Sequence, residues 1–291
     1  MRIKPDCLAC VLRQCLEATK LANANEEKAL SALKAAASLI ATFSNYDTPM
    51  SITMAMHRAV RKILGVNDPY KEVKRSFNEK GASAYPFLLR ILKNSHSPLE
   101  TAVKIAIAGN IVDYALPIEK DLDKSLELAL KTPLPRRDWQ IFQEELAKSK
   151  KILYLLDNAG EVFYDKILIE HLVDRGHKVI AVVRGGPAIN DALLEDAIFA
   201  GIDKLVKVLT TGLDTVGFIF KQASEEFLQA LDEADLIIAK GQANLESLDE
   251  TEYPAFFLLK AKCEIIAELT GVEVGEIVFQ ANRRRWKASG S

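Results

Sequence analysis

The sequence predicts an α/β protein in which a helical N-terminal domain packs on a doubly wound, mainly parallel sheet. Two patterns support this fold class. Residues up to about 148 repeat apolar side chains at three- and four-residue spacing, which is typical of amphipathic helices. Beyond residue 150, short apolar runs alternate with amphipathic stretches, and a strand–helix–strand order favours parallel neighbours joined by crossovers. We therefore expect a helical domain at 1–148 and an α/β domain at 149–291, with the site at their interface.

Helical signals run through the whole first domain. The clearest periodic segments are Ala29 to Phe43, Met54 to Leu64 and Tyr85 to Lys93. At residues 97–100, Ser-Pro-Leu-Glu reads as an N-cap, a proline at the first helical position and a capping-box glutamate, and Asp68-Pro69 predicts a similar helix start. The proline-rich segment 132–137 is the predicted linker, and a short helix from Trp139 to Lys148 follows it.

The second domain is predicted to alternate strands with helices. The predicted strands are Ile152 to Leu156, Val179 to Val183, Leu205 to Leu209, Leu236 to Ala239 and Ile277 to Phe279. The predicted helices are Val162 to Arg175, Asn190 to Ala200, Thr215 to Leu231 and Tyr253 to Thr270. The first apolar run is hydrophobic throughout rather than alternating, as in parallel strands that are buried on both faces.

The composition is that of an ordinary globular protein. Of 291 residues, 49% are hydrophobic and 27% are charged, which is enough to bury a sizeable core. The 38 basic and 40 acidic residues give a net charge of -2, so there is no reason to expect nucleic-acid binding. The N-terminus lacks an apolar signal core and no long uncharged run occurs, so we expect a cytoplasmic protein that does not enter a membrane.

Polar side chains follow several of the predicted strands at the point where each strand ends. They are Asp157, Asn158 and Glu161 after the first strand, Arg184 and Asp191 after the second, and Lys240 and Asn244 after the fourth. In open α/β sheets, ligands bind beyond the carboxyl ends of the strands. We therefore expect these residues to meet at one edge of the sheet.

These residue types fit a metal-assisted phosphoryl site. Divalent cations such as Mg²⁺ take oxygen ligands, and Asp157, the amide oxygen of Asn158 and Asp191 form such a set. The cations available to neutralise phosphate oxygens are Arg184, Lys240 and Lys262. Each residue also has an ordinary alternative, because Asn and Asp are common in turns and the acids Asp191 and Glu161 are favourable in a first helical turn.

In the helical domain, Asn110 and Asp113 lie three residues apart on an otherwise apolar helix, so they share one face. Buried polar groups need hydrogen-bond partners. The pair either forms a structural contact with a neighbouring helix or faces the crevice, where it would contact substrate or the residues that hold the metal.

The four cysteines lie at positions 7, 10, 15 and 263, three of them in the first helical segment. Cys7 and Cys10 form a Cys-x-x-Cys motif, which is half of a zinc site, a redox pair, or two small apolar residues of a helix. No further ligands occur nearby at matching spacing, and disulfide scaffolding is not expected in the cytoplasm.

In combination, the motifs resemble the damage-control phosphatase family, whose domain was long catalogued as one of unknown function. The motifs are Asp157-Asn158-Ala-Gly-Glu161, Asn190-Asp191, Lys240-Gly-Gln-Ala-Asn244 and Gly109-Asn110-x-x-Asp113. The resemblance covers nearly the whole chain. It includes the Cys7-x-x-Cys10 motif, similar to that of the archaeal and bacterial branch, and the segment Lys260-Ala-Lys262-Cys263.

The resemblance implies a helical domain joined to a Rossmann-like α/β domain. It also implies metal-dependent phosphatase activity supported by Mn²⁺, Ni²⁺, Co²⁺ or Mg²⁺, with Asp157, Asn158 and Asp191 as metal ligands and catalytic residues. The implied substrates are small phosphate esters, such as sugar phosphates or damaged phosphometabolites and nucleotides. The residues expected to bind substrate are Asn110, Asp113, Glu161, Arg184, Lys240, Asn244 and Lys262.

We favour attack by a metal-activated water over a covalent intermediate. Aspartyl-phosphate phosphatases of the haloacid dehalogenase type use Asp-x-Asp, whereas here Ala159 stands two residues after Asp157. Two other functions remain as alternatives. One is a carboxyl methyltransferase that uses S-adenosylmethionine, although the glycine-rich cradle after the first strand is poor. The other is a non-enzymatic metal-binding or redox-sensing protein that depends on Cys7 and Cys10.

Overall fold

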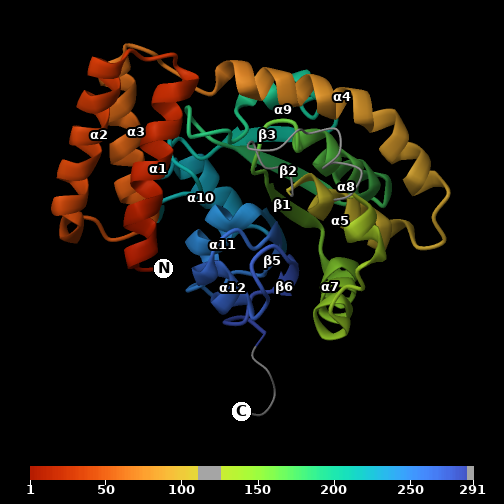
Figure 1. Cartoon of the computed structure of the whole chain (residues 1–291). Helices are drawn as coiled ribbons and strands as arrows, with labels where there is room; N and C mark the ends of the chain where they lie inside the picture. Colours follow the sequence, from red (N-terminus) through yellow and green to blue (C-terminus); the bar gives the residue numbers. More distant parts are fainter. Residues whose placement is uncertain (111–125, 287–291) are drawn as a thin grey trace.

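Three helices at the N-terminus pack into a bundle beside the sheet (Figure 1). The computed structural model describes residues 1–110 and 126–286. The bundle consists of α1 (Pro5–Leu21), α2 (Glu26–Ala41) and α3 (Pro49–Leu64), with the 3-10 turn η1 (Phe43–Asn45) before α3. Its core includes Cys15, Ile52 and Met56, each of them fully buried. Cys15 therefore has the packing role that is common for a free cysteine.

The remaining N-terminal helices pack on the α/β part rather than in the bundle. They are α4 (Lys71–Lys93), α5 (Pro98–Gly109) and α7 (Arg136–Lys148), and α4 and α5 pack on α8 (Val162–Asp174). Buried residues of α5, α7 and α8 share one hydrophobic core with the strands, among them Ile105, Phe142 and Ile167. The division into domains 1–148 and 149–291 stays a prediction.

One six-stranded sheet forms the centre of the α/β part. Its strands are β1 (Lys151–Leu155), β2 (Lys178–Val183), β3 (Lys207–Thr210), β4 (Leu236–Lys240), β5 (Ala255–Lys260) and β6 (Ile277–Ala281). The order is β3-β2-β1-β4-β5-β6, and all neighbours are parallel except β6, which is antiparallel to β5. The chain winds outward from β1 in one direction and from β4 in the other. The switch point, where such sheets bind ligands, therefore lies between β1 and β4.

Helices cover both faces of the sheet, which confirms the predicted fold class (Figure 1). One face carries α5, α7 and α8, and the other carries α10 (Glu225–Asp232), α11 (Gly241–Leu248) and α12 (Glu264–Thr270). The side chains of β1 alternate between them, because Ile152 and Tyr154 enter the first core whereas Leu153 and Leu155 enter the second. The short helix α9 (Leu194–Phe199) and the 3-10 turn η2 (Phe220–Gln222) complete the connections.

One predicted helix is wrong in its first half. The segment from Tyr253 to Thr270 contains strand β5, and only its last residues are helical, as α12. A short run of apolar residues fits a buried strand as well as a buried helix, and here pairing with β4 decides the outcome. The helices predicted over 190–200 and 215–231 begin later, at Leu194 and Glu225, because the chain first forms loops at the edge of the sheet.

Two predicted helix starts differ in detail. Ser97 is the N-cap of α5, but its side chain accepts no capping hydrogen bond. Helix α4 begins at Lys71, after a turn in which Asp68 Oδ1 accepts the backbone N–H of Tyr70 at 2.9 Å. The aspartate therefore stabilises the turn before the helix rather than its first residue.

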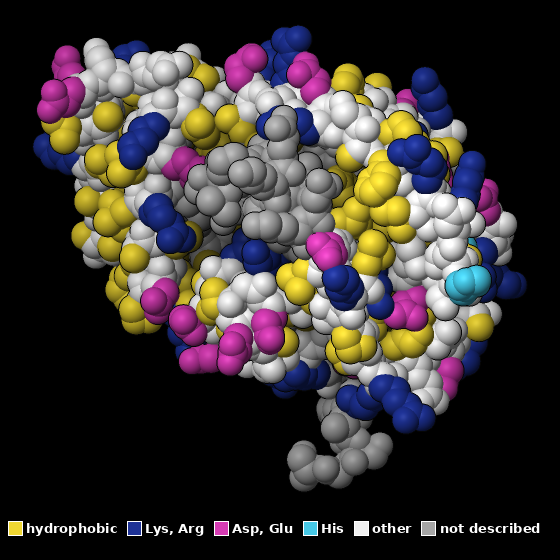
Figure 2. All heavy atoms as spheres, turned by 45° about the vertical axis from the view of Figure 1, so that its right-hand side comes forward, with side chains coloured by type: hydrophobic (Ala, Val, Ile, Leu, Met, Phe, Trp, Pro, Cys, Tyr) yellow, Lys and Arg dark blue, Asp and Glu magenta, His cyan; other side chains and the backbone are white. Residues whose placement is uncertain are grey.

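The surface in Figure 2 carries acidic and basic side chains in the same regions, in keeping with the net charge of -2. Hydrophobic side chains are exposed over the bundle, among them Leu16, Leu30 and Phe43. Within residues 1–110 and 126–286, no helix is both long enough and apolar enough to cross a bilayer.

Candidate functional site

Asp157 lies at the carboxyl edge of the sheet, two residues beyond the end of β1. Its carboxylate rests against Gly241, the first residue of α11, which has a φ of +75°. A Cβ at position 241 would lie 2.0 Å from Asp157 Oδ2, so only glycine leaves room for the carboxylate. The amino end of a helix carries partial positive charge, which favours an anion there. Asp157 thus occupies the switch point between β1 and β4.

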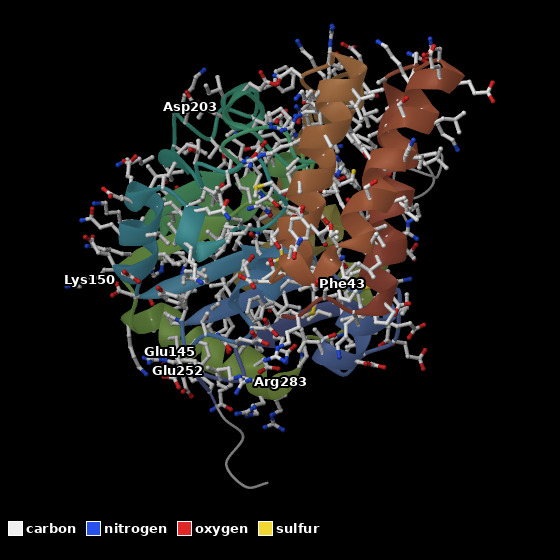
Figure 3. All side chains as sticks on the ribbon, turned by 90° about the vertical axis from the view of Figure 1, so that its left-hand side faces the viewer. Phe43, Glu145, Lys150, Asp203, Glu252 and Arg283 are labelled. Carbon is white, nitrogen blue, oxygen red and sulfur yellow. The ribbon has the colours of Figure 1, made fainter. Side chains whose placement is uncertain are left out.

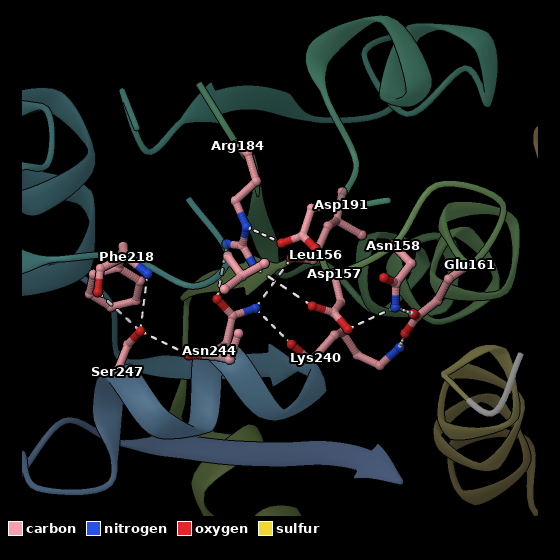
Figure 4. A network of polar contacts seen from close by, with 12 residues as sticks. Leu156, Asp157, Asn158, Glu161, Arg184, Asp191, Phe218, Lys240, Asn244 and Ser247 are labelled. Carbon is pink, nitrogen blue, oxygen red and sulfur yellow. Dashed lines mark hydrogen bonds and ion pairs between the residues drawn. The ribbon is translucent and has the colours of Figure 1, made fainter. Parts of the chain in front are cut away.

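Backbone hydrogen bonds join the loop after β1 to the loop after β2. Asn158 and Asp191 form an antiparallel bridge, and the N–H of Ala192 donates to the carbonyl of Asp157 at 2.7 Å. The three predicted metal ligands are therefore brought together by the backbone itself, as Figure 4 shows.

Arg184 crosses the floor of the site and is almost fully buried. Its Nε donates to Asp191 Oδ2 at 2.6 Å and its Nη1 donates to Asn244 Oδ1 at 3.0 Å. Its Nη2 has no hydrogen-bond partner among the described residues and lies 3.6 Å from Asp157 Oδ1. Asn244 in turn donates to the carbonyl of Leu156 at 3.2 Å. Arg184 therefore supports both carboxylates and is itself anchored on α11 (Figure 4).

Lys240 is a second buried cation and has no exposed surface. Its Nζ donates to Glu161 Oε1, to Asp165 Oδ1 at 2.7 Å and to the carbonyl of Ala106 at 2.8 Å. A lysine ammonium has three N–H donors, so all of them are in use. Lys240 therefore holds the carboxylates of Glu161 and Asp165 in place. Its predicted contact with substrate stays a prediction.

Two amides hold the carboxylates of Asp157 and Glu161 in place. Asn110 Nδ2 donates to Asp157 Oδ2 and to Glu161 Oε2, each at 2.9 Å. Asn158 Nδ2 donates to the same two oxygens at 2.8 and 2.9 Å. The carbonyl of the Asn110 side chain accepts the backbone N–H of Lys260 at 3.2 Å. Of the two alternatives for Asn110, the structure therefore favours the one in which its side chain faces the site. The helical half of the chain thus contributes a residue to the site.

Burial and neighbouring charges raise the pKa of both aspartates. Burial raises the pKa of Asp157, and the charge of Glu161 adds to the rise, whereas Arg184 and Lys262 lower it. Burial likewise raises the pKa of Asp191 to about 7, with Arg184 opposing the shift and the charge of Asp157 adding to it. Two repelling carboxylates in a buried site would gain stability from a bound cation.

The predicted ligands keep oxygen lone pairs open. Within the described residues, side-chain hydrogen bonds reach Asp157 and Asp191 only through Oδ2, so neither Oδ1 accepts one, although Asp157 Oδ1 lies 3.6 Å from Arg184 Nη2. Asn158 Oδ1 accepts one hydrogen bond, from Asn190 Nδ2 at 2.6 Å, and has a second lone pair. No three His, Cys, Asp or Glu side chains in the same ranges gather to hold a metal. Two carboxylates and an amide nevertheless fit a hard cation that keeps water and phosphate ligands.

Nearly all the predicted site residues meet at this edge of the sheet. The buried ones are Asn110, Asp157, Asn158, Glu161, Arg184, Asp191, Lys240 and Asn244. Lys262 is exposed, and its charge acts on Asp157 and Asp191. Asp113 lies outside the described residues. The roles assigned to these residues in metal and substrate binding stay predictions.

Sequence reasoning missed three contributors. Asp165 lies four residues after Glu161 on α8, and Tyr154 of β1 donates its hydroxyl to Asp165 Oδ1 at 2.7 Å. Asn190 belongs to a motif and to the start of a predicted helix, yet its side chain, which no prediction assigned to the site, contacts Asn158. The signal for Asp165 was its i, i+4 spacing from Glu161 within an otherwise apolar segment, which places both acids on one helix face.

A third thiol, Cys263, lies close enough to the Cys-x-x-Cys motif to act on its charge. Burial raises the pKa of Cys7, and the nearby Glu246, Cys10 and Cys263 raise it further. Cys10 Sγ also accepts a hydrogen bond from Gln14 Nε2 at 3.2 Å. Cys263 comes from the loop after β5, so its place beside Cys7 was not visible in the sequence. Whether the motif binds metal or acts in redox chemistry stays a prediction.

A small cavity and a larger groove lie at opposite ends of the strands. The cavity is about 20 Å³, borders Asn158, Glu161 and Asn190, and is also lined by Lys80 of α4. The groove is about 620 Å³ and lies among residues that precede the strands, such as Ser149 and Asp235. Figure 3 labels Glu145 and Glu252, which also line the groove. The predicted site therefore lies next to the cavity and away from the groove.

Comparison with known proteins places this geometry in a family. The sequence matches the model of the damage-control phosphatase ARMT1-like domain over residues 3–278. A damage-control phosphatase of Archaeoglobus fulgidus is 38% identical, with 96% of this chain and 98% of that protein covered. One of Pyrococcus horikoshii is 36% identical, with 97% and 99% covered. An uncharacterized protein of Methanocaldococcus jannaschii is 38% identical, with 96% and 95% covered.

A solved structure agrees with the sequence comparison. The crystal structure of a DUF89 family protein from Pyrococcus horikoshii superposes with a TM-score of 0.89 at 35% identity and covers 97% of this chain and 99% of that one. Sequence and fold thus agree over nearly the whole length. The chain belongs to the family of the damage-control phosphatase ARMT1-like domain.

Proposed function

We propose that this chain is a metal-dependent phosphatase that hydrolyses small phosphate esters, such as sugar phosphates or damaged phosphometabolites and nucleotides, in the cytoplasm. The observation that carries the proposal is the convergence of Asp157, Asn158 and Asp191 at the switch point, with oxygen atoms left open. The names of the curated relatives support phosphatase activity and a role in metabolite damage control. Mn²⁺, Ni²⁺, Co²⁺ and Mg²⁺ all suit such oxygen-rich ligands.

Each residue has a distinct part in the proposed reaction. Held by Asp157, Asn158 and Asp191, a divalent cation would supply charge for the phosphate oxygens and lower the pKa of the attacking water. Arg184 fixes the carboxylate of Asp191 through its 2.6 Å hydrogen bond. Lys262, exposed at the same edge, neutralises charge on the transferring phosphoryl group.

Water is the proposed nucleophile, rather than Asp157. Asp157 Oδ2 already accepts two amide hydrogen bonds, which stabilise the negative charge on the carboxylate and make it less reactive. The residue two positions later is Ala159, so no second acid stands there to protonate the leaving group. Asp157 therefore serves in this proposal as a ligand that orients the phosphate and the water.

The test is phosphate release from p-nitrophenyl phosphate and a panel of phosphorylated metabolites, with each divalent ion and then with a chelator. We expect turnover to require the ion and to be lost in Asp157→Ala and Asp191→Ala. Asp203→Ala, at an exposed acid away from the site, is the control and should retain full activity. Turnover that resists the chelator, or a fully active Asp191→Ala, would contradict the metal assignment.

The methyltransferase alternative has a direct test. Calorimetric titration of the metal-free protein with S-adenosylmethionine should give no heat of binding if the phosphatase proposal is right. Tight binding that needs no metal would favour the methyltransferase instead.

A further inference from the structure

Asp165 is a fully buried acid that lies outside the predicted ligand set. Its Oδ1 accepts hydrogen bonds from the hydroxyl of Tyr154 and from Lys240 Nζ, both at 2.7 Å. Both partners come from strands of the sheet, so Asp165 joins α8 to β1 and β4. Its Oδ2 is also buried and has no hydrogen-bond partner among the described residues. Burying an acid costs free energy unless it is paired and hydrogen-bonded, so Asp165 depends on its contacts with Tyr154 and Lys240.

The next link is Lys240, whose ammonium is shared between two carboxylates. It donates to Asp165 Oδ1 and to Glu161 Oε1, and its third N–H goes to the carbonyl of Ala106. Glu161 is 3% exposed, so its carboxylate depends mainly on partners within the protein. Lys240 fixes where the Glu161 carboxylate lies, and Asp165 fixes where Lys240 lies.

The last link is the amide of Asn158. Its Nδ2 donates to Glu161 Oε2 at 2.9 Å and to Asp157 Oδ2 at 2.8 Å. Because both acceptors lie on one side, the amide oxygen has to point to the other side, where Asn190 donates to it at 2.6 Å. If Glu161 moved, the amide could rotate and present N–H groups, which a cation repels.

We propose that Asp165 is a positioning residue for Asn158, acting through Lys240 and Glu161. This inference rests on the proposed function in one respect, because it assigns the amide oxygen of Asn158 to the metal. Asp165 itself contacts neither metal nor substrate. It keeps the Glu161 carboxylate in the place that selects the oxygen end of the Asn158 amide.

The first experiment measures Mn²⁺ binding by calorimetry without substrate. Asp165→Asn keeps the size of the side chain but removes its charge, and we expect Mn²⁺ affinity to fall by about 10- to 100-fold, as for other residues that orient metal ligands. The control is Asp68→Asn, which removes the charge from another buried Asp–Lys pair, with Lys74 at 2.6 Å. It should lower the melting temperature and leave Mn²⁺ affinity within about twofold of wild type, because the pair lies outside the relay.

A double-mutant cycle tests the route. If Asp165 acts through Glu161, the loss of affinity in Asp165→Asn combined with Glu161→Gln should be clearly smaller than the sum of the single losses. Additive losses would overturn the route through Glu161. A purely structural role would lower the melting temperature of Asp165→Asn without changing its Mn²⁺ affinity, and this result would also overturn the proposal.

A crystal structure of metal-free Asp165→Asn separates this inference from the proposed function. We expect the hydrogen bond between Asn158 Nδ2 and Glu161 to be lost and the amide to be rotated. An unchanged Asn158 would overturn the positioning role. If the wild type itself binds no Mn²⁺ and releases no phosphate, the proposed function fails, yet the metal-free structure still decides whether Asp165 orients the amide.

Discussion

Asn158 and Asp191 pair as an antiparallel bridge between two loops that leave parallel strands. This bridge sets the spacing of two predicted metal ligands through the backbone, so it does not depend on which side-chain atoms are present. Substitutions that change only the ligating atoms should therefore alter metal binding while the fold stays intact.

Asp191→Asn tests this separation. The change removes a charged ligand but keeps an oxygen that accepts the hydrogen bond from Arg184. Substituting a residue that only orients a metal ligand typically lowers metal affinity or activity about 10- to 100-fold. We therefore expect the loss of a ligand to reduce metal-dependent turnover by about 100-fold or more. The melting temperature of the metal-free protein should change little, because repulsion with Asp157 is removed at the same time. A large fall in melting temperature would contradict this account.

Lys262→Gln tests the exposed cation of the site. Because Lys262 is exposed, its substitution should leave thermal stability unchanged. Its charge acts on Asp157 and Asp191 in the free protein, and we expect the larger effect on the negative charge of the reacting phosphate, so kcat/KM should fall about 10- to 100-fold. Steady-state kinetics at several salt concentrations give the measurement, and Lys262→Arg should recover part of the activity. Equal activity of all three proteins would exclude a role for this charge.

Gly241→Ala tests the close approach of α11 to Asp157. The added Cβ would collide with the carboxylate, so we expect turnover and metal affinity to be lost. Gly65→Ala is a matched control, because its φ of +71° is similar but nothing lies within 4 Å of the added Cβ. The control should lose only the stability that alanine costs in a left-handed conformation, about 1–2 kcal/mol. It should keep full kcat. An active Gly241→Ala would show that Asp157 tolerates displacement.

Glu246→Gln tests a pH dependence that does not involve the predicted metal ligands. Burial raises the pKa of Glu246 from 4.5 to about 7. Between these values the folded protein holds a proton that the unfolded chain releases. This contribution to stability is therefore complete below pH 4.5 and is lost as the pH rises to about 7.

Thermal unfolding with a chelator, from pH 4.5 to 8, gives the measurement. The fall in melting temperature across this range should be smaller for Glu246→Gln than for wild type. Glu250→Gln is the control, because the side chain of Glu250 is 60% exposed, and its curve should follow that of wild type. Parallel curves for Glu246→Gln and wild type would contradict the burial of this acid.

The cysteines give a prediction about reactivity. Cys15 is fully buried, whereas Cys7, Cys10 and Cys263 are partly exposed. Titration of the native protein with a thiol reagent should therefore find three fast groups and one slow group, and Cys7→Ser should remove one fast equivalent. We expect phosphatase turnover of this variant to equal that of wild type. Loss of bound zinc without loss of turnover would assign Cys7 a separate metal-binding role.

The sequence predicted the polar edge of the sheet well, because strand ends carry their chemistry in adjacent residues. Asp157 and Asn158 directly follow an apolar run, and the parallel order brings them to Asp191. The strand that begins at Ala255 was missed, because its buried residues show neither alternation nor helical spacing. Its identity depends on pairing with β4, which is a contact between distant parts of the chain.

The supporting contacts were hidden for the same reason. Asp165 looked like an ordinary polar residue on a helix, since the sequence does not show that Tyr154 and Lys240 reach it. The approach of Cys263 to Cys7 likewise joins the two ends of the chain. Local patterns revealed which residues carry chemistry, whereas the partners that fix their geometry come from tertiary packing.

The two ends of the Asn110 side chain have a consequence for biosynthesis. Its amide N–H groups reach carboxylates beyond β1, and its carbonyl accepts a hydrogen bond from Lys260 at the end of β5. A ribosome releases all three predicted ligands long before it releases β5. A nascent or truncated chain that stops before Ala255 therefore carries every ligand and still lacks the contact that secures Asn110. The contacts that hold Asn110 in the site are therefore complete only after β5 has been synthesised.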